Sequence, residues 1–377
     1  MPKGSLKVIT FNILVLFALV SFIEIILGKW RSSSPAYDIP FTIVNKKIKY
    51  DGSKIYGPGK NSLINYSRDN NGYRNFTNKN AKKYFLTIGG STTDQRYIPD
   101  GFTFQDLLEK KLGENYAVIN AGVDGQTSYG HLVSIRDWHS KLLDKKKLDK
   151  IIFYFGVNDV RFTMFGVKRG QKEKWKSRSF FKKIRSSNLV QTISKKSYFY
   201  YWLRRIKYKL TTNRSADGIQ NVGHGTKNPE FIDEKEIKLF YKFNLDKIHE
   251  EYINLVKDLV IETNRFFPNS ELIFVQQPDN RCSFKDSRNV APRAIKLGEM
   301  GYGKGLIDYC KYLGIVYLAQ DEAFKSIKDS KVRSKINVLK MYIDNPIPNE
   351  GIYDGIHTNK IGSNYIANYL FEKIKLN

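Results

Sequence analysis

The sequence predicts an α/β protein: a three-layer α/β/α sandwich on a five-stranded parallel sheet, preceded by an N-terminal transmembrane helix. Short apolar runs alternate along the chain with segments of helical periodicity, which is typical of a parallel sheet covered by helices on both faces. An apolar run of membrane-spanning length stands near the N-terminus. The chain has 377 residues, 41% of them hydrophobic, which is enough for a large core.

The composition excludes several other classes of protein. Its hydrophobic content excludes a disordered, collagen-like or simple coiled-coil chain. The two cysteines, Cys282 and Cys310, are too few for a disulfide scaffold and lack the clustered spacing of a zinc site or a redox motif. They form either one disulfide, if the domain lies outside the cytoplasm, or two buried thiols. We expect no metal and no cofactor.

Residues 8–28 are almost wholly apolar and carry a single charge, Glu24. At about 1.5 Å per residue, a helix of about 21 residues is roughly 31 Å long and can cross the hydrocarbon core of a membrane. Trp30 follows where an interfacial aromatic residue is expected. A cleaved signal peptide is the alternative, but the run is long for one and no convincing small-residue cleavage site follows. We expect residues 1–7 to be a cytoplasmic leader and the large C-terminal domain to be periplasmic or extracellular.

The rest of the chain divides into an edge segment and a folded domain. Residues 29–82 are polar and rich in Asn, Lys, Gly and Tyr, so we expect a linker and irregular structure on the domain edge. The domain itself should cover residues 83–377. Its expected strands are 84–88, 116–120, 150–155, 271–277 and 314–318. Its expected helices are 103–112, 128–143, 234–266, 304–313 and 359–374.

A basic insertion interrupts the domain at about residues 161–230. Between Arg161 and Leu210 it contains sixteen Lys and Arg residues and a single acid, Glu173, interleaved with aromatic residues. This composition suits an anionic lipid surface or an acidic polysaccharide. Nucleic acid would suit it too, but the anchor on the same chain favours the cell envelope, so no nucleic-acid partner is expected. The alternative is a solvated basic helix whose aromatic residues lie in the core.

Four short polar blocks follow predicted strands or precede the last predicted helix. They are the Gly-Gly-Ser91 turn, the loop with Gly125, the Gly-Val-Asn158 turn and the Asp354-Gly-Ile-His357 turn. We expect them to meet in one cleft, because ligands of such sheets bind at the carboxyl ends of the strands. A serine becomes nucleophilic when a histidine takes its proton and a carboxylate orients that histidine. Backbone N–H groups and an asparagine amide can stabilise an oxyanion. The blocks together therefore predict acyl chemistry.

These blocks, in this order, resemble the SGNH hydrolases, also called the GDSL-like esterase/lipase superfamily. The resemblance covers about residues 83–375 and implies a flavodoxin-like sandwich. It implies that Ser91 is the nucleophile, that His357 is the base and then the acid, and that Asp354 orients His357. The backbone N–H groups of Ser91 and Gly125 and the side chain of Asn158 would form the oxyanion hole. The sequence departs from the family name motif at Gly90, where that motif has Asp. The basic insertion also makes the gap between the third and fourth blocks long.

The resemblance and the anchor together imply a membrane-anchored serine esterase that removes acyl groups, with acetyl as the favoured acyl group, from extracytoplasmic glycans. Three alternatives remain. The first is an O-acyltransferase, which would pass the acyl group from the serine to a sugar hydroxyl and would need a polytopic membrane protein as partner. The second is a non-catalytic envelope subunit that keeps the fold. The third is a lipid esterase, which would need an apolar acyl pocket that the sequence does not locate.

Overall fold

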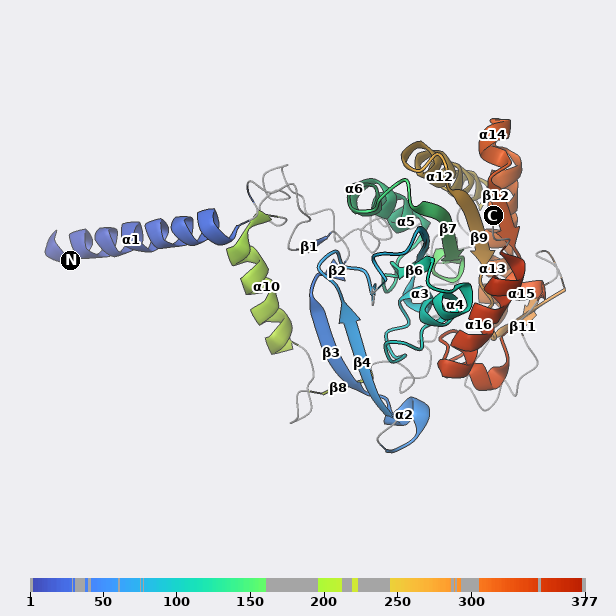
Figure 1. Ribbon diagram of the computed structural model, residues 1–377, viewed down its shortest axis with the longest axis horizontal. Coiled ribbons are helices and arrows are strands. Elements are labelled where there is room, and N and C mark those ends of the chain that lie inside the picture. The colour runs from blue at the N-terminus through green and yellow to red at the C-terminus, as the bar shows by residue number, and fades with distance from the viewer. Residues whose placement is uncertain are drawn as a thin grey trace.

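A computed structural model describes residues 3–28, 30, 38–39, 42–59, 62–74, 76, 78–160, 196–211, 219–222, 245–285, 288, 290–292, 305–344 and 347–374 (Figure 1). The centre of the molecule is a five-stranded sheet in the order β12-β9-β7-β5-β6, in which every neighbouring pair is parallel. Its strands are β5 (Lys83–Gly89), β6 (Tyr116–Asn120), β7 (Leu148–Phe155), β9 (Glu271–Gln276) and β12 (Ile336–Leu339). The predicted parallel sheet and the positions of its first four strands are confirmed.

Two helical layers cover the sheet. On one face α4 (Phe104–Leu112) packs against α16 (Lys360–Lys373), and on the other α12 (Leu245–Phe266) packs against α5 (Ser128–Ser134) and α13 (Gly305–Lys325). Successive strand residues point to opposite faces. The side chains of β5 and β7 therefore divide between two buried clusters, one under each layer. The three-layer α/β/α sandwich is thus the observed architecture.

The fifth predicted strand, 314–318, is wrong. These residues lie inside α13, which extends twelve residues past the predicted end of the helix at residue 313. The run Gly-Ile-Val-Tyr-Leu is short, apolar and β-branched, and periodicity does not separate such a run in a buried helix from a buried strand. The edge strand is β12 instead. Of the helix predicted at 234–266, residues 234–244 lie outside the described part of the chain.

The segment 29–82 contains regular structure that the sequence analysis did not predict. Strands β3 (Lys46–Asp51) and β4 (Leu63–Arg68) form an antiparallel pair, and β8 (Gln220–Asn221) joins β3 in parallel. Their alternating apolar residues bury a third cluster with Tyr97 and Val222. The many Lys and Asn residues between those apolar residues concealed the two-residue period.

Helix α1 (Lys3–Leu27) projects from the body of the molecule, and α10 (Tyr198–Thr211) lies against its end (Figure 1). Residues 8–27 have a mean hydropathy of 2.4 and none of their most apolar stretch is buried, so α1 is long and apolar enough to cross a membrane. Of the basic insertion, residues 161–195, 212–218 and 223–230 lie outside the described part of the chain.

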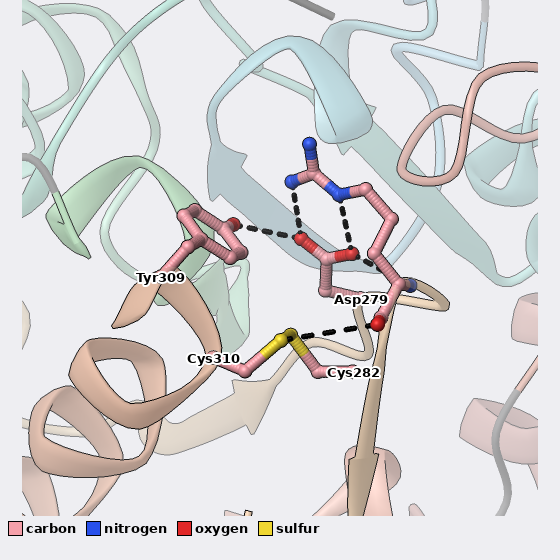
Figure 2. Close-up of a disulfide and its surroundings, with 5 residues drawn as sticks. Asp279, Cys282, Tyr309 and Cys310 are labelled. Carbon is pink, nitrogen blue, oxygen red and sulfur yellow. Dashed lines mark hydrogen bonds and ion pairs between the residues drawn. A yellow bond between two sulfur atoms is a disulfide. The ribbon is translucent and has the colours of Figure 1, made fainter. Parts of the chain in front are cut away.

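The remaining described elements are short. They are β1 (Asp38–Ile39), β2 (Thr42–Ile43), α2 (Ser53–Tyr56), α3 (Ser91–Asp94), a π-helical turn (Ile135–His139), α6 (Ser140–Leu142), 3₁₀ turns at Val157–Asp159 and Asn349–Gly351, β10 (Cys282–Phe284), β11 (Val290–Pro292), α14 (Ser330–Arg333) and α15 (Met341–Asp344). Helix α5, the π-helical turn and α6 together occupy the helix predicted at 128–143. Cys282 and Cys310 are joined as a disulfide, which decides between the two alternatives for these cysteines (Figure 2).

Candidate active site

Ser91 stands at the carboxyl end of β5, as the first residue of the short helix α3. The turn before it is tight. A Cβ on Gly90 would lie 2.0 Å from Nδ2 of Asn158. Asn158 therefore occupies the space in which a side chain at position 90 would begin, so any residue larger than glycine there would require the Asn158 side chain to move. The same close approach places Asn158 directly beside the Ser91 turn.

Ser91, His357 and Asp354 form one connected chain of hydrogen bonds. His357 Nε2 lies 2.8 Å from Ser91 Oγ, and His357 Nδ1 lies 2.7 Å from Asp354 Oδ2. Burial raises the pKa of Asp354, but the hydrogen bonds from His357 and from the N–H of Ile356 outweigh it and leave that pKa below its usual value of 3.8. The ionised carboxylate only accepts hydrogen bonds, so Nδ1 carries the hydrogen and Nε2 accepts from the Ser91 hydroxyl.

The local turn holds Asp354 and His357 in this geometry. Asp354 Oδ1 also accepts the backbone N–H of His357 at 2.8 Å and of Ile356 at 3.2 Å. Gly355, between them, has φ +88°, a conformation that disfavours side chains. The Tyr353 ring stacks on the His357 ring, with centroids 5.8 Å apart. The imidazole is therefore fixed at both its nitrogens and one face.

The other described histidines are unsuited to this role. His131 and His139 are buried, and burial lowers the pKa of each to about 3. They remain neutral at physiological pH and face the core rather than Ser91. His249 lies on α12 and contacts Glu322 at 2.9 Å. Within the described part of the chain, His357 is thus the histidine placed to act on Ser91.

The two remaining predicted oxyanion groups lie on the adjacent loops. Asn158, in the 3₁₀ turn after β7, donates from Nδ2 to the carbonyl of Gln126 at 3.0 Å. Gly125 precedes Gln126, has φ +72°, and has no atom within 4 Å of the position a Cβ would take. Its neighbour Asp124 lines the same pocket as Ser91. The structure thus gathers the four blocks at one edge of the sheet, while the roles of Asn158 and Gly125 as oxyanion donors stay predictions.

An open pocket of about 330 Å³, its mouth included, lies over Ser91 and His357. It is mostly polar. Its lining residues are Ser91, Thr92, Asp94, Gln95, Arg96, Tyr97, Asp124, Tyr353, His357 and Thr358. Among the described residues, no group of three or more His, Cys, Asp or Glu side chains is arranged to hold a metal ion.

A buried ion network, missed by the sequence analysis, supports the turn after Ser91. Asp94 Oδ1 accepts from Arg68 Nη2 at 2.7 Å and from the Tyr66 hydroxyl at 2.9 Å. Arg74 donates to the backbone carbonyls of Asp94, Gln95 and Ile98. Burial raises the pKa of Asp94, but the nearby guanidinium groups, Arg68 first, hold it below 3.8. The two basic residues, Arg68 and Arg74, belong to the segment predicted to be a linker, where nothing distinguished them from surface charges.

Arg96 lines the pocket between two carboxylates. It pairs with Asp124 at 3.2 Å and with Asp94 at 3.5 Å. Lys46 lies nearby, and burial, followed by the charges of Arg96 and Arg68, lowers its pKa to about 8. Burial lowers the pKa of Arg96, but the carboxylates of Asp94 and Asp124 outweigh it and raise that pKa, so this wall of the pocket carries both signs of charge and offers polar contacts.

The disulfide loop contacts the turn that carries Asp354 and His357. Asn280 donates its backbone N–H to the carbonyl of Gly355 at 3.1 Å, and the side chain of Arg281 packs on Gly355. Arg281 in turn forms a two-pronged pair with buried Asp279, at 2.9 and 2.6 Å, and Tyr309 donates to the same carboxylate at 2.7 Å (Figure 2). The disulfide closes this cluster between β10 and α13.

No protein-family model matches the sequence, and no curated protein matches it. Solved structures do match in fold. A Bacteroides ovatus protein described as a GDSL-like lipase is 12% identical with a TM-score of 0.41, over 79% of this chain and 56% of that chain. Est24, a carbohydrate acetylesterase from Sinorhizobium meliloti, is 14% identical with a TM-score of 0.36, over 78% of this chain and 98% of that one. An aryl esterase of M. smegmatis is also 14% identical, with a TM-score of 0.35, over 77% and 97%. Identities and TM-scores in this range assign no activity to the chain. They say only that it is similar in fold to GDSL-like lipases and esterases.

Proposed function

We propose that the protein is a membrane-anchored serine esterase of the SGNH type that removes acyl groups, with acetyl as the favoured acyl group, from extracytoplasmic glycans. The observation that carries the proposal is the unbroken chain from Ser91 through His357 to Asp354 at the floor of an open polar pocket. Residues 266 positions apart in sequence meet there at hydrogen-bond distance. This is the arrangement that nucleophilic acyl transfer needs.

The mechanism follows from these positions. His357 Nε2 takes the proton of the Ser91 hydroxyl as Oγ attacks the ester carbon. The tetrahedral oxyanion would be stabilised by the N–H groups of Ser91 and Gly125 and by Asn158, and donors of this kind each contribute about a hundredfold or more to the rate. His357 then protonates the departing alcohol and leaves an acyl-serine. A water molecule, deprotonated by His357, releases the acid and restores Ser91.

Three features support a small acyl group on a polar carrier outside the cytoplasm. The residues that line the pocket carry hydroxyl, amide and charged groups, which suit a polar carrier. Arg96 can face a charged or hydroxylated sugar. The disulfide between Cys282 and Cys310 supports an oxidising compartment. The third feature is the apolar helix α1, because a domain exported behind such a helix would meet an extracytoplasmic substrate and an oxidising compartment.

The test uses the full-length protein in detergent and a panel of acetyl, butyryl and longer-chain esters on simple alcohols and sugars. We expect release of acetate, lost at least a thousandfold in Ser91→Ala, together with labelling of Ser91 by a fluorophosphonate. Ser283→Ala, at an exposed serine, is the matched control and should retain full activity. Absence of hydrolysis and of labelling would contradict the proposal. Acyl transfer that occurs only with a sugar acceptor would identify the same site as that of a transferase.

A further inference from the structure

The first turn of α10 is bound to the far end of α1 through Glu24. Glu24 Oε1 accepts the hydroxyl of Ser197 at 2.5 Å and the backbone N–H of Phe199 at 2.8 Å. Oε2 accepts the backbone N–H of Tyr198 at 3.2 Å and the indole of Trp30 at 2.9 Å. N–H groups in the first turn of a helix have no partner within that helix. The carboxylate therefore caps α10 from more than 170 residues away and complements its dipole.

This capping explains the one charge in the apolar helix. A lone carboxylate near the end of a membrane span is costly unless it finds donors. Glu24 finds four, all at the end of α1 that faces the folded domain. The start of α10 is thereby fixed at the level where α1 leaves the apolar layer. Figure 1 shows α10 beginning at this end and running across the line of α1 rather than continuing it.

Among the described side chains of α10, the exposed ones are apolar or aromatic. The exposed fractions of Phe199, Trp202 and Leu203 are 41%, 48% and 45%, and spacings of three and four residues place them on one face. The rings of Phe199 and Trp202 stack with centroids 6.1 Å apart. The sequence of the same helix carries four cations and no acid, at positions 204, 205, 207 and 209. A short amphipathic helix with exposed aromatic residues and a basic composition is typical of the membrane interface.

We propose that α10 lies in the headgroup layer of the bilayer that α1 crosses, with anionic phospholipid as its partner and Glu24 as the link between the two helices. The argument for lipid over another partner is continuity with α1, whose apolar surface is itself uncovered and which ends where α10 begins. The basic composition supplies the charge complement. Two contacts with the membrane, rather than a single tether, then hold the catalytic domain in one orientation.

The test places the full-length protein in nanodiscs of three parts phosphatidylcholine to one part phosphatidylglycerol, with bromine atoms at a shallow acyl position. The quenched part of the tryptophan emission is compared between the wild type and Trp202→Phe. We expect the wild type to be quenched by about twice as much as the variant, because Trp202 and Trp30 both lie at the interface and the variant keeps only Trp30 of the two. Discs of phosphatidylcholine alone should give weaker quenching. Equal quenching in the two lipid compositions would overturn the anionic part of the proposal.

A separate variant tests the link between α1 and α10 through Glu24. Glu24→Gln should reduce the Trp202 signal at least twofold, because the amide leaves the first turn of α10 with weaker acceptors. Glu262→Gln, which breaks a surface pair with Arg136, is the matched control and should change nothing. Unquenched Trp202, failure of the protein to enter discs, or a change in Trp202 emission with an acidic oligosaccharide alone would each overturn the proposal. None of these outcomes depends on esterase activity.

Discussion

At the scale of single residues, the site depends on groups whose charge state is set by their neighbours. Asp354 stays ionised because His357 and two backbone N–H groups donate to it. Asp159, one residue beyond Asn158, is a buried carboxylate with only neutral donors. In the proposed mechanism the first orients the base, while the second supports a loop. Both roles can be tested by replacing the aspartate with asparagine, which removes the charge and keeps the shape of the side chain.

Replacing Asp354 with Asn should lower kcat by about a hundredfold or more, because the amide favours the imidazole tautomer that cannot accept the Ser91 proton. KM should change little, since Asp354 does not line the pocket. Steady-state hydrolysis of a soluble acetyl ester measures both. Asp137→Asn, at an exposed carboxylate paired with Lys141, is the matched control. Full activity in Asp354→Asn would remove Asp354 from the mechanism.

Asp159 should make the protein less stable as the pH rises from about 4 to about 6. Burial raises its pKa to about 6, partly offset by hydrogen bonds from Ser128 and Tyr252. Between the unfolded value of 3.8 and this folded value, only the folded state holds the proton. The free energy of unfolding therefore falls with pH, by about 1.4 kcal/mol per unit from this group, and stays reduced above the window.

Urea unfolding of the wild type and Asp159→Asn at several pH values isolates this contribution, because the other titrating groups are common to both proteins. The wild type should lose stability relative to the variant as the pH rises from 4 to 6. Parallel profiles would show that Asp159 keeps an ordinary pKa.

The contact between Ser91, His357 and Asp354 could be predicted from the sequence because its signal is local. Each block is a few residues long and lies after a strand or before the last helix, so these three candidate catalytic residues could be proposed without knowledge of the packing. Arg68, Arg74 and Arg96 were not, because their partners are backbone carbonyls and carboxylates from other elements. A sequence shows a basic residue but not its burial.

At the scale of elements, β5 and β7 could be predicted from their local sequence, whereas β12 could not. The first two are apolar runs followed by glycine turns and were predicted within a residue or two. Strand β12, Ile336–Leu339, has only four residues at the sheet edge and is half exposed, so it lacked a continuous apolar run. Helix α13 had such a run because it is buried against α12 and the sheet. In both elements the apolar content of the local sequence therefore follows burial in the folded protein rather than the type of secondary structure.

The disulfide between β10 and α13 should stabilise the fold and the catalytic turn together. A loop of this size, with cysteines 28 residues apart, is expected to contribute about 3.5 kcal/mol to the free energy of unfolding. The double variant Cys282→Ser, Cys310→Ser should unfold at correspondingly lower denaturant. It should also lose several-fold in kcat, because Asn280 and Arg281 contact Gly355 between the catalytic residues.

Wild-type protein treated with a reductant should reproduce both effects, and its reoxidation should reverse them. A double variant as stable and as active as the wild type would show that the loop around Asp279 holds its shape without the bond.

At the scale of the whole molecule, the described part of the chain divides into the α/β/α sandwich and the two helices α1 and α10, which contact each other outside it. The two buried clusters under the helical layers are built from the sheet and its covering helices, with no contribution from α1. The described contacts of α1 are mainly with α10. The sequence predicted this division from the apolar run, but not the contact of Glu24 with α10, because its two sides are separated by the whole first half of the domain.

Removal of residues 1–28 should therefore leave the sandwich intact. The core of the truncated protein does not include α1, so its melting temperature should lie within about 2 °C of that of the full-length protein in the same detergent, whereas a loss of about 3 kcal/mol would lower it by about 4 °C. Hydrolysis of a soluble acetyl ester should be unchanged within twofold, since Ser91, Asp354 and His357 lie in the sandwich. Hydrolysis of an acetylated glycan fixed to anionic vesicles should fall, because the second substrate reaches the pocket only when the domain is held at the surface. Equal loss on both substrates would mean that α1 stabilises the catalytic site itself, and the separation of the two parts would then be wrong.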